Sequence, residues 1–236
     1  MNIAVVSLFR NMVGRIDPYM AQIDTLQRHV WLDSTDHTVR VIAVTGDNTD
    51  ATEDELQVSA NRYRVPLSIV KCNHGLQVFP SCEDPNRLAA LTKVLMAGMR
   101  AVSHDKYGDD VVLYVESDLI WNPHQVGSII DMAYRRDGYF DIIAPMIFCG
   151  DGSQFYDVWG FRHDGARFSW DAPYTHDLLY GGITELDSVG SCFACRAKVA
   201  EKVTPIGKLA LVSWCNGARA QGYQVGVAQG FRVSHP

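Results

Sequence analysis

Four short, almost wholly apolar runs, separated by amphipathic segments, constrain the fold of this chain more than any other feature. Strands that are buried on both faces of a parallel sheet are apolar throughout, whereas a strand with one solvated face alternates. The segments between the runs place apolar residues at helical spacing. Strand and helix therefore alternate, which predicts an α/β fold with a mainly parallel central sheet flanked by helices. The predicted strands are 3–9, 39–45, 67–72 and 111–115, and the predicted helices are 17–29, 53–63 and 87–102.

The second half of the chain has a less regular pattern. In the segment FRHDGARF, Asp164 and Gly165 predict a two-residue hairpin turn, because both residue types accept positive φ angles. Around this hairpin lies a stretch rich in glycine and aromatic residues. The remaining predicted elements are strands at 141–148, 186–195 and 223–234 and a helix at 206–221.

The length and composition of the chain fit a single folded domain. Its 236 residues are 47% hydrophobic and 20% charged, which is enough to bury one substantial core. We find no internal repeat and no linker rich in proline, glycine or serine. We therefore expect one domain over 1–236 with two chemically different halves, about 1–122 and about 123–236.

Several features indicate a cytoplasmic protein, in a bacterium or in the host cytoplasm of a virus. The chain has no apolar run long enough to span a membrane, and IAVVSLF at its start lacks the basic region of a secretory signal. Its six cysteines are irregularly spaced and do not suggest a disulfide framework. The formal net charge of −6 gives no general attraction to nucleic acid or to anionic membranes.

A carboxylate pair follows the most apolar run, in VVLYVESDLIWNP. On an extended chain Glu116 and Asp118 project to one side, while Ser117 points to the other. Ligands of open α/β sheets bind outside the carboxyl ends of the strands. A divalent ion with oxygen ligands, Mn²⁺ or Mg²⁺, would bridge these carboxylates to a diphosphate. The alternative is that acidic residues simply end a strand at a solvated turn.

Polar residues also end other predicted strands, where they would contribute to a nucleotide-binding site. Asp47 follows the run 39–45 and could accept hydrogen bonds from a base or ribose, or it could close an Asx turn in GDNTD. Ser7 and Arg10 end the first run and would lie beside Asp47.

Two basic residues of the predicted helix 87–102 are further candidates for contact with a diphosphate. Arg87 stands near the helix start, where anions are favoured, and Lys93 lies farther along. Both could also be ordinary solvated side chains, and this alternative is favoured for Lys93.

A family resemblance covers most of the chain in patches. The segments VIAVTGDNTDATEDEL, ESD, ELDSVGSCFACRAKVAEK and GYQVGVAQGFRVSH resemble the fungal Golgi α-mannosyltransferases of the mannan-polymerase type. Those proteins are GT-A glycosyltransferases with a DxD motif. The resemblance implies the GT-A (nucleotide-diphospho-sugar transferase) fold, with the nucleotide-sugar in the half 1–122 and the acceptor in the half 123–236.

The resemblance also assigns a metal site. Asp118 matches the second acid of the DxD motif, Glu116 stands in place of its first aspartate, and His235 matches a metal-ligating histidine. Glutamate keeps the carboxylate but adds a methylene, so Asp118 is the firmer candidate for a direct contact. Imidazole together with carboxylates suits Mn²⁺ and equally tolerates zinc or iron.

The catalytic candidates are Glu185 and Asp187 in ITELDSVGSCFACR, which the predicted strand would place on one face. The resemblance places Asp187 in an E-x-D-S-V-G motif. A carboxylate there would take the acceptor proton in an inverting reaction, or position the acceptor or stabilise the donor sugar in a retaining one. The alternative is an acid pair that caps a strand beside a glycine turn.

The acceptor-binding candidates are Tyr156, Asp157 and Trp159, in the aromatic-rich middle segment together with Trp170. Aromatic faces and a carboxylate can bind a sugar ring or stack on a planar acceptor, although the same residues could form local core. Cys192 and Cys195 would point to opposite faces of a strand, which argues against a zinc or thioredoxin-like site.

The leading hypothesis is a metal-dependent glycosyltransferase, a hexosyl- or pentosyltransferase that uses a UDP- or GDP-linked sugar. Its acceptor would be a glycan or lipid-linked glycan, or a modified DNA base if arginines formed a basic face. A nucleotidyltransferase is the second hypothesis, although SLFRNMVGRID poorly matches a glycine-rich basic phosphate loop. The third is a non-catalytic module that binds nucleotide-sugars. The arginines considered for the basic face are Arg135, Arg136, Arg162 and Arg167.

Overall fold

The alternation predicted for the first half is confirmed by the computed structural model, which describes residues 1–29, 37–75, 79–81, 83–135, 140–174 and 182–236. Each predicted strand and helix of this half is present, with ends within two residues of those expected. The strands are β1 (Asn2–Phe9), β2 (Thr38–Thr45), β3 (Leu67–Lys71) and β4 (Val111–Val115). The helices are α1 (Ile16–His29), α2 (Thr52–Tyr63), α3 (Pro85–Arg100) and the short α4 (His104–Tyr107).

The second half contains the predicted hairpin and last strand, together with elements that the pattern did not indicate. Asp164 and Gly165 have φ angles of 49° and 78°, as the hairpin turn requires. Helix α5 (Pro123–Arg135) was not predicted. The other elements are β5 (Ile120–Trp121), β6 (Ile142–Cys149), β7 (Arg162–His163), β8 (Ala166–Arg167), β9 (Ile183–Glu185), β10 (Cys192–Arg196), α6 (Ala197–Lys202), α7 (Ala210–Ala220) and β11 (Val225–His235).

The strand predicted at 186–195 is wrong in its first part. β9 ends at Glu185 and β10 begins only at Cys192. Between them the Leu186 N–H still donates to β11, but the next contacts lie outside the main sheet: the N–H of Asp187 donates to the Arg162 carbonyl, and the N–H of Ser191 donates to the Asp157 carboxylate. Apolar residues that suggested a strand are buried here, but they lie in the segment 186–191 that connects β9 to β10. We call this connection the crossing segment.

Nine strands form the main sheet in the order β3-β2-β1-β4-β10-β6-β11-β5, with β9 paired to β11, and β7 and β8 form a separate two-stranded sheet. The neighbours among β1 to β4 are parallel, and β6 is parallel to β11. β10 runs antiparallel between β4 and β6, and β5 and β9 are antiparallel to β11. The carboxyl ends of β1, β2, β3 and β4 therefore meet at one edge of the sheet, where ligands bind in folds of this kind.

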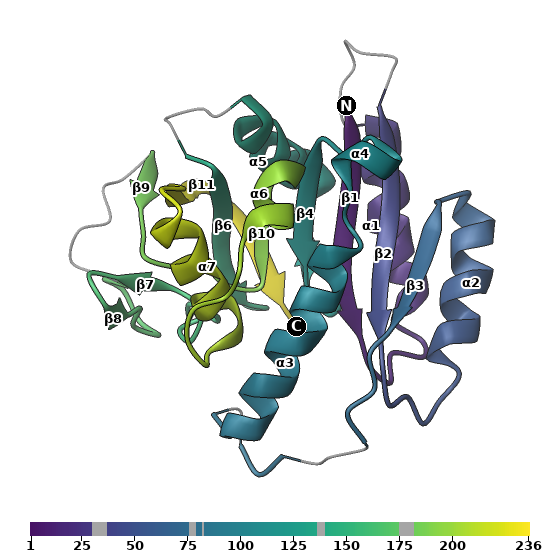
Figure 1. Ribbon diagram of the computed structural model, residues 1–236, viewed down its shortest axis with the longest axis horizontal. Helices are drawn as coiled ribbons and strands as arrows, with labels where there is room; N and C mark the ends of the chain where they lie inside the picture. The colour runs from purple at the N-terminus through teal and green to yellow at the C-terminus, as the bar shows by residue number, and fades with distance from the viewer. Residues whose placement is uncertain (30–36, 76–78, 82, 136–139, 175–181) are drawn as a thin grey trace.

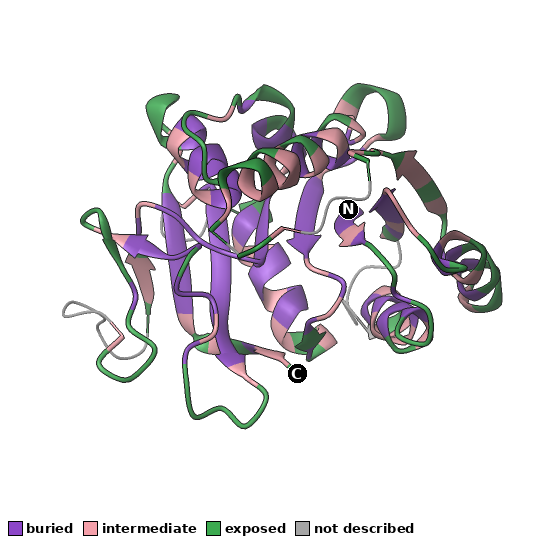
Figure 2. Cartoon of the chain, turned by 90° about the horizontal axis from the view of Figure 1, so that it is seen from below, coloured by how far each residue is buried: buried purple, intermediate pink, exposed green. Residues whose placement is uncertain are grey.

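Helices cover both faces of the sheet. Figure 1 shows α3, α6 and α7 in front of the strands, with α1 behind them. In Figure 2 the buried strands lie between helices whose buried sides face the sheet. The core accordingly takes residues from β1, β2, β4, β6 and β10 and from the inner sides of these helices. Within the described residues, the helices are too short or too polar to cross a membrane.

Helix α3 lies unusually close to the sheet because of Gly98. A Cβ atom at this position would stand 2.5 Å from Val6 Cγ1 and 2.9 Å from Val44 Cγ2. Glycine therefore lets the helix rest directly on β1 and β2. The amino-terminal half of α3 then extends past the carboxyl ends of those strands.

Candidate functional site

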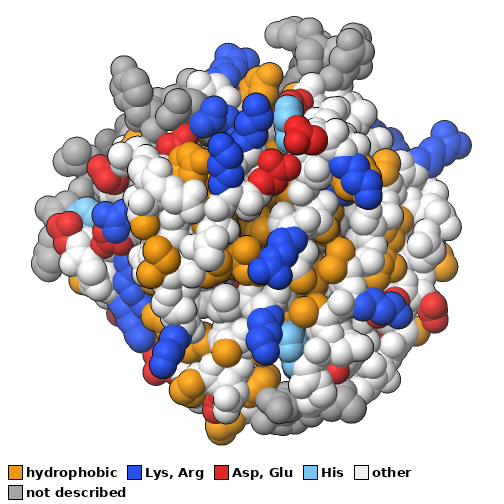
Figure 3. Space-filling model, in the orientation of Figure 1, with side chains coloured by type: hydrophobic (Ala, Val, Ile, Leu, Met, Phe, Trp, Pro, Cys, Tyr) orange, Lys and Arg blue, Asp and Glu red, His pale blue; other side chains and the backbone are white. Residues whose placement is uncertain are grey.

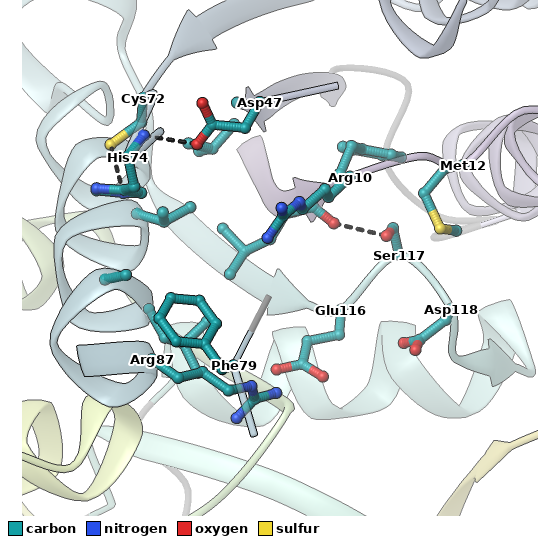
Figure 4. Close-up of a pocket in the computed structure, with 17 residues that line it drawn as sticks. Arg10, Met12, Asp47, Cys72, His74, Phe79, Arg87, Glu116, Ser117 and Asp118 are labelled. Carbon is teal, nitrogen blue, oxygen red and sulfur yellow. Dashed lines mark hydrogen bonds between the residues drawn. The ribbon is translucent and has the colours of Figure 1, made fainter. Parts of the chain in front are cut away.

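A cavity of about 340 Å³ opens at the carboxyl ends of the four parallel strands and is walled on one side by α3. Figure 4 shows the side chains that enter it from these strand ends and from the helix. Such a volume is at the lower end of the range for small-molecule sites. The residues that line it are Leu8, Phe9, Arg10, Met12, Val44, Gly46, Asp47, Cys72, His74, Phe79, Arg87, Ala90, Leu91, Val94, Glu116, Ser117 and Asp118.

The carboxylates of Glu116 and Asp118 extend to the same side just after β4 (Figure 4). Ser117 turns the other way, and its hydroxyl donates to the Leu8 carbonyl over 2.6 Å. This hydrogen bond ties the turn after β4 to the end of β1. The two carboxylates are thereby held together at one end of the cavity.

Glu116 lies in an environment that favours its protonated form. Burial raises the pKa of Glu116 to about 8, and the negative charges of Asp157 and Asp118 act in the same direction. A hydrogen bond from Ser191 and the positive charge of Arg87 oppose this shift only in part. A cation bound at this carboxylate would compete with the proton, so metal binding would release a proton here.

Asp118 meets His235, which is brought from the far end of the chain by β11. The His235 Nε2 atom is 3.2 Å from Asp118 Oδ2, and its Nδ1 atom is 3.0 Å from the Pro236 carbonyl oxygen. The other carboxylate oxygen, Asp118 Oδ1, is buried and has no hydrogen-bond partner among the described residues. When Nδ1 donates to the carbonyl, Nε2 and the Asp118 carboxylate present lone pairs to the same region.

These two side chains fit a hard divalent ion. Adjacent ligands of an octahedral ion with bonds of about 2.1 Å lie about 3.0 Å apart, close to the 3.2 Å between Nε2 and Oδ2. Among the described residues, however, no three His, Cys, Asp or Glu side chains form a ready-made cage. An ion held by Asp118 and His235 would therefore take its remaining ligands from water or from a bound phosphate group, as Mg²⁺ commonly does.

Asp47 lies at the opposite end of the cavity, where its carboxylate is engaged by the protein itself. Its oxygens accept hydrogen bonds from the backbone N–H groups of His74, over 2.6 Å, and Gly75, over 3.1 Å. Asp47 also has a positive φ of 51°. Asp47 thus shapes the segment after β3.

Sequence reasoning missed the residues that line this end of the cavity beside Asp47. Cys72, His74 and Phe79 all contribute to the wall, and the Cys72 sulfur lies 3.5 Å from His74 Nε2. The one available signal was their position after the run 67–72, because parallel strands end at the same edge of the sheet.

The four basic and hydroxyl candidates for nucleotide binding separate into two groups. Arg10 and Arg87 line the cavity, Arg10 just after β1 and Arg87 from the first turn of α3. Ser7 is fully buried instead, with its hydroxyl 2.6 Å from that of Tyr19 and 2.5 Å from the Val115 carbonyl. Lys93 is exposed on α3. The structure therefore brings only the two arginines to the cavity.

The structure does not bring Glu185 to the metal-site carboxylates. Glu185 is exposed and pairs with Gly226 near the start of β11, whereas His235 ends that strand. Asp187 lies in the crossing segment, where its carboxylate accepts from the Gly165 N–H and forms an ion pair of 2.5 Å with Arg219. Asp187 thus tethers the β7–β8 hairpin to α7.

The three acceptor-side candidates have different environments. Asp157 is buried, and its carboxylate accepts hydrogen bonds from the N–H and hydroxyl of Ser191 and from the Gly160 N–H. Tyr156 is half-buried and stacks on His235. Trp159 is exposed, packs edge-on against Trp170 and donates to Glu83.

The arginines considered for a basic face do not form one. Arg162 is buried and donates to the carbonyls of Val158 and Phe161, while Arg135 and Arg167 form ion pairs with acidic side chains. Arg136 lies outside the described residues. Figure 3 shows the Lys and Arg side chains of one face scattered among acidic, apolar and neutral groups.

Comparison with known proteins identifies the fold. No protein-family model and no curated protein matches the chain. Among solved structures, S. aureus TarS matches with a TM-score of 0.62 and 11% identity, over 99% of this chain and 36% of TarS. The chain therefore spans little more than a third of the length of TarS.

Two further structures match over more of their own length. UTP-bound UGPase from Acinetobacter baumannii has a TM-score of 0.57 and 11% identity, over 100% of this chain and 88% of the enzyme. The second is glucosyl-3-phosphoglycerate synthase from Mycobacterium tuberculosis, in complex with Mn²⁺, UDP and phosphoglyceric acid. It has a TM-score of 0.54 and 13% identity, over 100% of this chain and 70% of the synthase. The predicted fold class is confirmed: this is the fold of GT-A glycosyltransferases and nucleotidyltransferases. Nothing in these matches supports the fungal mannan-polymerase type in particular.

Proposed function

We propose that this chain transfers a sugar from a nucleoside diphosphate donor, with Asp118 and His235 holding Mn²⁺ or Mg²⁺. The observation that carries the proposal is the unpartnered buried oxygen of Asp118, whose other oxygen faces His235 Nε2. A cation is the partner that this arrangement lacks. Its place at the carboxyl ends of parallel strands, in a fold shared with Mn²⁺- and UDP-bound glucosyl-3-phosphoglycerate synthase, suits a nucleotide-sugar.

The cavity offers complementary chemistry along its length for such a donor. Gly46, Asp47, Cys72 and His74 would enclose the base and ribose, and Arg10 and Arg87 would neutralise the diphosphate. When bound, the divalent ion would offset the charge of the departing nucleoside diphosphate. Glu116 stands beside this point and would bind the ion directly or through water once it has lost its proton.

The acceptor is proposed to approach from the half 123–236. Trp159 and Trp170 are exposed there, and the hydrogen bond from Trp159 to Glu83 ties this pair to the segment that leads into α3. An exposed aromatic pair suits the apolar face of a sugar ring. We propose Asp157 and Asp187 as residues that hold this half in place, because their oxygens are engaged by the protein.

The test is turnover of nucleotide-sugars in the presence of Mn²⁺. Purified protein would be incubated with UDP-, GDP- and pyrimidine-linked sugars, and release of the nucleoside diphosphate would be measured with and without EDTA. We expect metal-dependent release that falls about a hundredfold or more in Asp118→Ala, the size of effect seen when a key charge-stabilising group is removed. Asp105→Ala, at an exposed site on α4, is the control.

Two results would contradict the proposal. One is the absence of both binding and turnover across the panel. The other is equal activity of Asp118→Ala and wild type. Because Asp118 Oδ1 is buried without a partner, the substitution should not destabilise the metal-free fold, so lost activity can be assigned to the site.

A nucleotidyltransferase is the second candidate, and the match over 88% of the A. baumannii UGPase favours it. Such an enzyme would join UTP to a sugar 1-phosphate and release pyrophosphate. Incubation with UTP and sugar 1-phosphates, followed by pyrophosphate detection, separates the two activities. Pyrophosphate release without turnover of UDP-sugars would replace the glycosyltransferase proposal with this one.

A further inference from the structure

The aromatic ring of Tyr156 lies flat against the imidazole of His235. The ring centroids are 3.9 Å apart and the planes are inclined by only 11°. Such a face-to-face contact restricts rotation of the imidazole out of its plane. The other two contacts of His235 are made by the ring nitrogens at its edge, from Nδ1 to the Pro236 carbonyl and from Nε2 toward Asp118. The stack adds a contact on the face of the imidazole, where the two edge contacts do not act, and so opposes tilting of the ring.

Tyr156 is itself held firmly by neighbouring elements. Its backbone N–H donates to the Ile147 carbonyl of β6 over 2.8 Å. The next residue, Asp157, is buried and bound to Ser191 and Gly160. β6 and β11 are parallel neighbours, with Cys149 opposite His235. The stacked rings are thus attached to two adjacent strands of the same sheet.

The Tyr156 side chain is close enough to three acidic residues to be influenced by their charges. Burial raises the pKa of Tyr156, and the negative charges of Glu116, Asp118 and Asp157 raise it further. The hydroxyl therefore remains protonated over the physiological range. A neutral, half-buried ring can stack on His235 without adding a charge to the site.

We propose that Tyr156 is a positioning residue, whose ring holds the His235 imidazole in the plane that directs Nε2 toward the cation site at Asp118. This inference rests on the proposed function, and it assigns to Tyr156 a role other than acceptor binding. Partners that orient a metal-ligating histidine commonly contribute 10–100-fold to metal affinity. The stacking face is the important feature, so phenylalanine should replace tyrosine and leucine should not.

The stack itself can be tested in the metal-free protein. A ring that lies over an imidazole shifts the carbon-bound protons of the imidazole upfield in NMR spectra. His235→Gln identifies these signals by their disappearance. We expect Tyr156→Phe to retain the upfield shift and Tyr156→Leu to lose it, with folding of each variant checked by circular dichroism.

The positioning role is tested by Mn²⁺ affinity, measured from the electron paramagnetic resonance signal of free Mn²⁺ with and without UDP. We expect Tyr156→Leu to weaken Mn²⁺ binding about tenfold or more and Tyr156→Phe to bind nearly as wild type does. Tyr134→Leu, at an exposed position on α5, is the matched control and should have no effect.

The outcomes separate this inference from the proposed function. If His235→Ala weakens Mn²⁺ binding and Tyr156→Leu does not, the positioning role is overturned while the metal site stands. If Tyr156→Phe is as defective as Tyr156→Leu, the hydroxyl rather than the stack matters, and the inference is wrong. If wild type binds no Mn²⁺ even with UDP, both fail, and a retained upfield shift shows the stack to be purely structural.

Discussion

At the scale of single residues, the cavity gathers negative charge that the metal-free protein does not fully compensate. Burial raises the pKa of both Glu116 and Asp157, and the negative charges of Asp157 and Asp118 raise the pKa of Glu116 further. Only Asp157 has its oxygens satisfied by several hydrogen bonds from the protein. We therefore propose that Glu116 and Asp118 are the carboxylates that a cation would engage, since perturbed acidic groups are common at functional sites.

Glu116 gives a prediction about pH. Its pKa is about 8 in the folded protein and near its ordinary value of 4.5 in the unfolded chain. Between these values the folded state keeps a proton that the unfolded state has lost, so the free energy of unfolding should fall as pH rises from about 4.5 to about 8. We expect Glu116→Gln to show a smaller fall, measured by urea denaturation of the metal-free protein across this range. If the free energy of unfolding changed equally with pH in the two proteins, the raised pKa of Glu116 would be contradicted.

Mn²⁺ should offset part of the fall in the free energy of unfolding that is expected as pH rises. Because the ion favours the ionised carboxylate, its binding should release protons and become tighter as pH rises toward 8. Calorimetric titrations with Mn²⁺ in two buffers of different ionisation enthalpy would measure the protons released. Glu116→Gln should release fewer protons than wild type, and an unchanged number would show that Glu116 does not bind near the ion.

At the scale of elements, α3 connects packing to the site. Gly98 allows the helix to lie against Val6 and Val44, and the first turn of the same helix carries Arg87 into the cavity. Asp84 caps the helix by accepting from the N–H groups of Asn86 and Arg87. The position of Arg87 is thus fixed both by the cap and by a contact near the other end of the helix.

A larger side chain at Gly98 should disturb both stability and function. The Cβ atom alone would approach Val6 within 2.5 Å, so Gly98→Val must displace α3 from the sheet. We expect a loss of about 1–3 kcal/mol in the free energy of unfolding, typical of an overpacked core. Urea denaturation would measure it, and weaker UDP binding should accompany it because Arg87 moves with the helix. Ala89→Val, on the exposed side of α3, should change neither quantity appreciably.

At the scale of the whole molecule, we propose that the two halves of the chain form one domain. β10, from the half 123–236, pairs with β4, and β11 pairs with β5, from the half 1–122. The hydrophobic core also draws buried residues from both halves. The proposed metal site lies at an edge of this assembly, so folding should not require the ion.

Metal and nucleotide should therefore raise the stability of a protein that is already folded. EDTA should leave the circular dichroism spectrum unchanged. Mn²⁺ with UDP should raise the melting temperature, since a ligand at 100 times its Kd stabilises by about 2.7 kcal/mol. Asp118→Ala should lose most of this increase. Unfolding by EDTA alone would show instead that the metal is part of the folding core.

The sequence by itself determined the alternation of strand and helix in the first half and the orientation of Glu116 and Asp118. These features are local, because burial on both faces makes a strand apolar throughout and extended backbone alternates its side chains. It also indicated Arg10 and Asp47, because the carboxyl ends of parallel strands share one edge, and Arg87, because anions are favoured near a helix start. All three line the cavity. His235 was expected at the metal site from the family resemblance, and its place beside Asp118 is a contact between residues far apart in the chain.

Only the tertiary structure decided which distant residues meet. It inserted β10 antiparallel between β4 and β6, placed Glu185 at the start of β11 rather than beside His235, and stacked Tyr156 on the imidazole. It also buried Ser7 and directed the carboxylate of Asp47 to the backbone of His74. Strand pairing and side-chain packing between remote segments set these positions, and no local periodicity in the sequence encodes them.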